Sequence, residues 1–316
     1  MYLAVFFSIT LSCRQGIKSG SAVSEHSISK GVLEIDGSRL AYKIEGEGMP
    51  CLIVGSSVYY PKTFSPALRK HLRMYFVDMK WFSPEYAPEN PDSVDIASIT
   101  ADVEEIRRKL GLDNPLIMGH SIHGTIAAEY VKRYPDKVAG LIVIGSPPLW
   151  GSEAYSQKAE ALWATASPDR KALQEENWGK LQEIDRLTGV EEAAARYNNT
   201  SPQYWYDMHY DAGWLWQDMT VHSEVTQHLF TRVFNEYDMF KPPYEIPVPM
   251  LVIMGKYDYV IPYTSWQEWY EAVPDFQLLL FEKSGHTPQL EESERFDAEL
   301  LKWLVNRQTQ GKIRGR

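Results

Sequence analysis

The chain alternates short, continuously apolar runs with longer segments in which apolar residues recur at helical spacing. The apolar runs have the length of strands and do not alternate with polar residues, which is typical of strands buried on both faces of a sheet. Apolar residues at a 3.6-residue period from Ile99 to Leu110 predict a helix that ends at Gly111. The predicted inner strands are 50–55, 74–78, 116–118, 138–145, 250–255 and 276–281.

Two further segments predict how the fold begins and ends. An antiparallel entry hairpin is predicted from the runs 32–35 and 40–44, with Asp36-Gly37 at its turn. A closing helix is predicted near the C-terminus, where one face is apolar: Phe296, Leu300, Trp303 and Leu304. Strands that alternate with helices predict the α/β class, a mainly parallel sheet with helices on both faces.

A sharp turn is predicted directly after the strand at 116–118, in the segment Gly119-His120-Ser121-Ile122-His123-Gly124. A strand, a glycine, a serine and a helix of small residues lift one hydroxyl above the edge of a parallel sheet, as a nucleophilic serine requires. The pattern Gly-x-Ser-x-Gly has its second glycine two residues after the serine, where this chain has His123. His120 and His123 are interpreted as packing or hydrogen-bonding residues, with a second catalytic role or metal binding as the alternative.

Asp258 and His286 also follow predicted strands, those at 250–255 and 276–281. A lone aspartate is more often a helix cap, and a lone loop histidine more often makes a local hydrogen bond. Here Ser121, Asp258 and His286 occur in this order, and each comes just after a strand. This joint placement predicts a catalytic triad at the edge of the sheet.

In these motifs, and in the order of the three residues, the chain resembles the α/β-hydrolase superfamily over about 31–304. The resemblance implies an α/β-hydrolase fold, a serine nucleophile and no cofactor. It also implies an oxyanion hole made by two backbone N–H groups. One is that of Ile122; the other lies in the loop 54–57, where relatives have His-Gly-x-Pro, and Ser56 is the favoured residue.

The interval 147–246 is far longer than an ordinary connection between a strand and a helix. Helical stretches are predicted within it at 154–164 and 169–187, and we interpret the interval as a helical lid over the site. The chain is thus divided into four parts: an N-terminal signal-like segment (1–30), the core (31–146 and 247–307), the lid (147–246) and a C-terminal tail (308–316).

Tryptophan and tyrosine are concentrated in the lid, most densely at 204–216. A single tryptophan there most often belongs to the lid's own small core. Because one face of a lid lies on the site, some of these rings are expected to line the pocket. The candidates for substrate binding are Trp205, Tyr206, Trp214 and Trp216. Aromatic walls indicate a bulky, largely apolar substrate.

The composition fits one large α/β domain with a lid, because 44% of the 316 residues are hydrophobic. The net charge of -10 argues against nucleic acid or an anionic membrane surface as a partner. The eight histidines lack the spacing of a metal motif, so no metal is expected. Cys51 lies in a predicted buried strand and is interpreted as an inert thiol. No oligomeric state is predicted.

The N-terminus carries a short apolar run, 1–12, that leads into Cys13 and a polar stretch at 14–30. This arrangement resembles a bacterial lipoprotein signal, in which the cysteine becomes the acylated first residue. It lacks a basic start, has Thr10 where leucine is usual, and is too short for an ordinary transmembrane helix. Two interpretations stay open: an exported enzyme tethered to a membrane through a lipidated Cys13, and a cytoplasmic enzyme.

The predicted reaction is hydrolysis of a small-molecule carboxylic ester or lactone through an acyl-enzyme. A serine rather than a carboxylate at the elbow disfavours haloalkane dehalogenase and epoxide hydrolase chemistry. The elbow 119–124 and the aromatic lid resemble serine-dependent esterases that open macrolide antibiotics, which implies a role in antibiotic resistance. Two alternatives stay open: a catalytically silent ligand receptor, and a prolyl aminopeptidase whose lid offers Asp207, Asp211 or Asp218 to a substrate ammonium.

Overall fold

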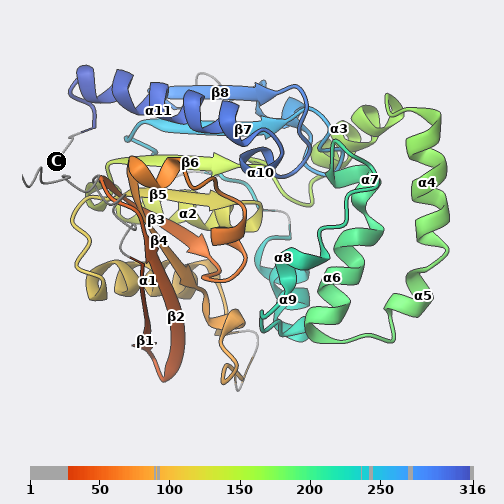
Figure 1. The fold of residues 1–316 in the computed structure, drawn as a ribbon, viewed down its shortest axis with the longest axis horizontal. Helices are drawn as coiled ribbons and strands as arrows, with labels where there is room; N and C mark the ends of the chain where they lie inside the picture. Colours follow the sequence, from red (N-terminus) through yellow and green to blue (C-terminus); the bar gives the residue numbers. More distant parts are fainter. Residues whose placement is uncertain are drawn as a thin grey trace, which may run out of the picture.

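The computed structural model describes residues 28–313 except 89, 91–92, 236, 242–244 and 270–272. Its centre is an eight-stranded sheet in the order β1-β2-β4-β3-β5-β6-β7-β8 (Figure 1). The pairs β1–β2 and β2–β4 are antiparallel, and the other neighbours are parallel. The predicted α/β class is confirmed. The strands are β1 (Ser29–Ile35), β2 (Ser38–Glu45), β3 (Met49–Gly55), β4 (Leu72–Asp78), β5 (Leu116–His120), β6 (Gly140–Ile144), β7 (Met250–Gly255) and β8 (Phe276–Phe281).

Two hydrophobic cores lie on opposite faces of this sheet. Leu52 and Val54 of β3 belong to one core, and Cys51 and Ile53 belong to the other, since successive side chains of a strand point to opposite faces. Strands β3, β5, β6 and β7 are buried along their whole length. Burial on both faces explains why the sequence reads as continuous apolar runs. The Cys51 thiol is fully buried, and burial raises its pKa, as an inert thiol requires.

Helices cover both faces of the sheet. The core of Val54 includes residues of α1 (Ile96–Lys109) and α2 (Ile122–Arg133), and the core of Ile53 includes residues of α11 (Ser293–Thr309). The predicted apolar face of the closing helix is confirmed. The prediction of a tail at 308–316 is wrong at its start, because α11 runs to Thr309 and Ile313 is buried against the same core. Shorter turns are α10 (Pro288–Glu291), η1 (Tyr60–Lys62), η2 (Leu68–Lys70), η3 (Lys80–Phe82), η5 (Pro135–Lys137) and η7 (Tyr263–Trp266).

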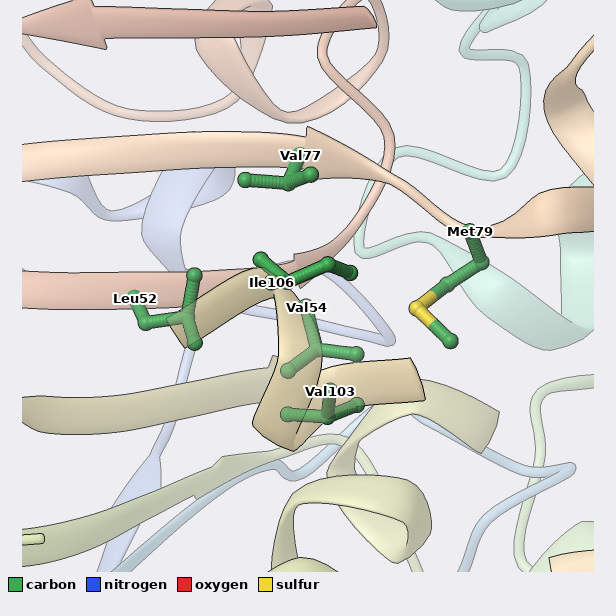
Figure 2. A pocket seen from close by; sticks show the side chains of 6 residues that line it. All are labelled: Leu52, Val54, Val77, Met79, Val103 and Ile106. Carbon is green, nitrogen blue, oxygen red and sulfur yellow. The ribbon is translucent and has the colours of Figure 1, made fainter. Parts of the chain in front are cut away.

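The packing of α1 on the sheet is close (Figure 2). The space between the sheet and the helix is too small to hold a water molecule, so it is apolar interior and not a binding site. Six apolar side chains border it: Leu52, Val54, Val77, Met79, Val103 and Ile106.

A helical insertion, 147–246, separates β6 from β7 and lies beyond the end of the sheet toward which these strands point (Figure 1). The helix predicted at 154–164 is confirmed by α3. The helical stretch predicted at 169–187 forms two helices, α4 and α5, and α4 ends at Trp178, directly before Gly179, a weak helix former. The elements of the insertion are α3 (Glu153–Ala164), α4 (Pro168–Trp178), α5 (Leu181–Ile184), α6 (Gly189–Asn199), α7 (Ser201–Tyr204), α8 (Gly213–Trp216), α9 (Ser223–His228) and the π-turn η6 (Leu229–Val233).

The N-terminal segment is described only in part. Strand β1 begins at Ser29, inside the segment 1–30 that was expected to precede the core. The signal-like run and Cys13 lie outside the described residues. Within the described residues, no helix combines the length and hydrophobicity needed to span a membrane.

Candidate active site

Ser121 occupies a strained turn between β5 and α2. Its backbone has φ 57° and ψ -133°, a conformation that residues other than glycine rarely adopt. The N–H of Ser121 donates to the carbonyl oxygen of Ile144 on β6 at 2.8 Å, which holds the turn against the sheet. At Gly119 a Cβ atom would lie 2.0 Å from the carbonyl oxygen of His123, so only glycine fits there. The turn therefore has the form of a nucleophile elbow.

Asp258 and His286 are paired by a hydrogen bond. The Asp258 Oδ2 atom lies 2.6 Å from His286 Nδ1, and neither side chain is more than 3% exposed. The other carboxylate oxygen accepts from the N–H groups of Ile261 (2.8 Å) and Val260 (3.2 Å), which fixes the aspartate. Burial lowers the pKa of His286 below its ordinary 6.5, so the neutral ring is favoured and can accept a proton.

Ser121 and His286 line one cavity of about 440 Å³, a volume within the usual range for small-molecule sites. Its walls are mainly aromatic and aliphatic, and they come both from the core domain at the sheet edge and from the insertion. Besides the serine and the histidine, the core domain contributes Ser56, Tyr59, Tyr60, Trp81, Phe82, His120, Ile122 and His123. The insertion contributes Ala193, Arg196, Tyr197, Thr200, Tyr204, Trp216, Met219, Val221, Thr226, Leu229 and Phe230.

The residues predicted for the oxyanion hole lie at the cavity. Ile122 is the first residue of α2, and Ser56 follows β3. In the chain as described, neither backbone N–H donates to a protein acceptor. The loop after β3 is fixed by a hydrogen bond in which the N–H of Ser57 donates to Asp78 Oδ1 at 2.6 Å. Both residues of the predicted oxyanion hole thus line the cavity with backbone N–H groups that are free of protein acceptors.

Only one of the four predicted substrate-binding aromatics lines the cavity. Trp216 does so, with its ring 5.4 Å from that of Tyr59. Trp205 is 1% exposed and belongs to the interior of the insertion, and Tyr206 and Trp214 are 43% and 39% exposed on the outside. The prediction is therefore wrong for these three residues. Trp214 and Trp216 are two residues apart on the single turn α8, so their side chains point to different sides of it.

Sequence reasoning missed the aromatic wall that the core domain supplies. Tyr59 and Tyr60 follow the loop after β3, and Trp81 and Phe82 follow β4. These are carboxyl ends of parallel strands, the same kind of position that identified Ser121, Asp258 and His286. Applying that rule to every parallel strand would have found these four rings.

The loop that carries His286 is bonded directly to the insertion. The N–H of His286 donates to the carbonyl oxygen of Tyr204 at 2.5 Å. The Glu291 carboxylate accepts from Tyr206 N–H through one oxygen (2.8 Å) and from Gly285 N–H through the other (2.9 Å). The insertion and the histidine loop therefore fix each other's positions.

His120 also supports this loop. Its Nε2 atom lies 2.8 Å from the carbonyl oxygen of His286, and because a carbonyl only accepts, Nε2 carries the proton. Burial lowers the pKa of His120, which keeps the ring neutral. Among the described residues, no group of three or more His, Cys, Asp or Glu side chains is arranged to hold a metal ion. The contacts of His120 are those of a packing and hydrogen-bonding residue.

Comparison with known proteins agrees with this geometry. A family model described as alpha/beta hydrolase fold matches residues 53–293. The AB hydrolase superfamily protein YclE of Bacillus subtilis (strain 168) is 32% identical over 87% of this chain and 98% of its own. A proline iminopeptidase of Clostridioides difficile (strain 630) is 23% identical over 88% of this chain and 98% of its own. The solved esterase EaEST from Exiguobacterium antarcticum has a TM-score of 0.62 at 18% identity, over 87% of this chain and 98% of that one.

Proposed function

The chain belongs to the α/β-hydrolase fold family, and we propose that it is a serine hydrolase that cleaves a carboxylic ester or lactone of a bulky, apolar small molecule. One observation carries the proposal: a serine on a strained elbow and a buried histidine–aspartate pair border the same apolar cavity. That arrangement provides a nucleophile, a base and an orienting carboxylate at one place.

In the proposed mechanism, Ser121 Oγ attacks the carbonyl carbon while His286 Nε2 takes the hydroxyl proton. Asp258 holds Nδ1–H and stabilises the imidazolium that forms. The backbone N–H groups of Ser56 and Ile122 donate to the oxyanion. The tetrahedral intermediate collapses, and the alcohol oxygen leaves with the proton from His286. Water, deprotonated by His286, then attacks the acyl-enzyme and releases the acid and free Ser121.

The residues of the cavity wall favour an ester as substrate rather than a peptide with a free N-terminus. The similarity to a proline iminopeptidase makes a peptidase the alternative to consider. A peptidase that recognises a free N-terminus needs an anionic group to pair with the substrate ammonium. In the described chain, no Asp or Glu side chain lines the cavity, whereas the cation Arg196 does. Asp207 and Asp211 accept backbone N–H groups within their own loop instead. A substrate ammonium would therefore be unpaired in this cavity, which is costly in an apolar site.

Within the ester class we propose a macrolide-type lactone as the candidate natural substrate. Its support is the resemblance of the elbow and of the aromatic insertion to macrolide esterases, together with the apolar character of the wall. Ring opening would add one water molecule across the lactone bond and would inactivate such a drug.

The test is to incubate the purified protein and its Ser121→Ala variant with short p-nitrophenyl esters, a 16-membered macrolide and proline p-nitroanilide, and to identify products by mass spectrometry. We expect Ser121-dependent ester hydrolysis and a gain of one water on the macrolide, with the anilide intact. Cleavage of the anilide alone would replace the esterase by a peptidase. Binding of the macrolide without turnover of any substrate would indicate a ligand receptor.

A further inference from the structure

We propose that His123 recognises a hydroxyl group on the substrate, remote from the scissile bond, through its Nε2 atom. This inference rests on the proposed ester hydrolysis and narrows its substrate class to hydroxylated esters or lactones. His123 lies two residues after Ser121 and lines the same cavity, so one molecule in this cavity can reach both residues.

The position of His123 departs from the elbow pattern, which has glycine there, and the fold makes room for the ring. Gly55 approaches closely: a Cβ atom at this position would lie 2.2 Å from a ring carbon of Tyr60 and 3.1 Å from His123 Cγ. A side chain at residue 55 would therefore clash with the imidazole or with the tyrosine that binds it. The glycine at 55 thus makes space for the imidazole beside the nucleophile.

The imidazole is held in one orientation. Its Nδ1 atom lies 2.7 Å from the hydroxyl oxygen of Tyr60. The Trp81 ring is stacked against it, with 6.0 Å between centroids and 16° between planes, and Phe82 lies 5.9 Å away. Only 6% of His123 is exposed. Burial lowers its pKa to about 3, so the ring is neutral at physiological pH.

The second ring nitrogen has no partner. His123 Nε2 is buried and makes no hydrogen bond with any described residue. Buried polar atoms are normally paired because an unpaired one loses its hydration without compensation. Trp216 Nε1 is the other unpartnered buried side-chain atom on a cavity residue within the described chain, but an indole nitrogen can only donate. The adaptable polar group near the nucleophile is therefore His123 Nε2.

The hydrogen-bond network identifies what Nε2 can bind. The Tyr60 hydroxyl has one proton and two neighbours that accept it, His123 Nδ1 at 2.7 Å and the carbonyl oxygen of His120 at 3.2 Å. If the proton goes to Nδ1, Nε2–H is a donor; if it goes to His120, Nδ1–H donates to Tyr60 and Nε2 accepts. A substrate hydroxyl both donates and accepts, so it complements either tautomer. A neutral imidazole also suits an uncharged hydroxyl better than an ion.

The test compares p-nitrophenyl esters whose acyl chains carry one hydroxyl, moved stepwise along the chain, with their unsubstituted parents. The wild-type protein should prefer at least one hydroxylated ester by roughly three- to tenfold in kcat/KM, the value of one neutral hydrogen bond. His123→Phe keeps an aromatic ring but removes Nε2. It should abolish the preference, so that the hydroxylated ester and its parent have the same kcat/KM; the ratio of the two values is the readout, since the variant also removes the Nδ1 partner of Tyr60.

Two further variants keep the test decisive. Phe82→Leu trims the apolar wall beside the same imidazole, so it should change each hydroxylated ester and its parent by the same factor. His123→Met, whose flexible apolar side chain adapts to the space, serves if His123→Phe does not fold.

The proposal is overturned if the wild-type protein shows no preference anywhere in the series. It is also overturned if the His123 variants slow each hydroxylated ester and its parent by the same factor, since His123 would then only support Tyr60 and the elbow. Absence of Ser121-dependent acetate hydrolysis would instead defeat the proposed function itself.

Discussion

The two tryptophans of α8 provide a matched test of how the insertion shapes the cavity. Trp216 lines the cavity, whereas Trp214, two residues earlier on the same helical turn, is 39% exposed on the outside. Trp216→Ala should therefore weaken hydrolysis of a bulky lactone, and Trp214→Ala should not. The two variants remove the same side chain from the same element, so they differ in the side that it faces and in the contacts made there, which for Trp214 include a hydrogen bond from Nε1 to the Tyr210 hydroxyl.

The size of the effect follows from contact area. A tryptophan side chain buries about 150–250 Å² in full contact, and a ligand that touches one edge of it covers roughly 60 Å². At about 25 cal/mol per Å², this contact contributes about 1.5 kcal/mol, which is roughly tenfold in kcat/KM. Trp216 also contacts Tyr59 and Tyr197, with ring centroids 5.4 and 5.7 Å away, so its loss should lower Tm as well.

The assay measures kcat/KM for a large lactone and for p-nitrophenyl acetate, with Tm recorded for each protein. The acetate reaches Ser121 without needing the wall and reports whether the site survives the substitution. We expect about a tenfold loss for Trp216→Ala on the lactone and less than twofold on the acetate. An equal loss on both substrates, or an equally strong effect of Trp214→Ala, would refute the placement of Trp216 in the substrate wall.

The remaining predictions concern the polar groups of the site. Ser121→Ala should lower kcat on the order of a millionfold without a change in the circular dichroism spectrum, and a residual rate above about a hundredth would exclude Ser121 as nucleophile. Asp258→Asn should cost on the order of ten-thousandfold by misorienting His286, and full activity would mean that another carboxylate serves. Burial raises the pKa of Asp78 from 3.8 to about 6, so the folded state binds this proton more tightly than the unfolded state. The free energy of unfolding should therefore fall by on the order of 3 kcal/mol as pH rises from about 4 to above 6. Asp78→Asn keeps an acceptor for Ser57 but cannot titrate, so its stability relative to the wild type in urea unfolding should increase from pH 4.5 to 7.5; a constant difference would contradict this.

The central sheet could be predicted from the sequence because burial on both faces leaves a local mark. Every residue of a doubly covered strand such as β3 must be apolar, whichever helix covers it. The closing helix was predictable for a related reason, since α11 has an apolar face at helical spacing. The break between α4 and α5 within the helical stretch 169–187 was not predicted because the exposed insertion helices have little buried surface, which leaves a weak periodic signal.

The site was predictable where topology brings positions together. Loops after parallel strands meet at one edge of the sheet, so Ser121, Asp258 and His286 could be expected near one another before any contact was known. The substrate wall was not predictable in this way. The single turn of α8 is too short to show a period, so the sequence does not tell that Trp216 faces the cavity while Trp214 faces out.

The sequence by itself determined the α/β class, the order of the strands' loops and the three residues of the expected triad. Each of these depends on a local pattern or on chain order, and both are written in the sequence. Only the tertiary structure decided which aromatic rings line the cavity and which nitrogen is left without a partner. Those properties depend on contacts between distant segments, such as the approach of Gly55 to His123 and the bond from His286 N–H to Tyr204, and no local pattern encodes such contacts.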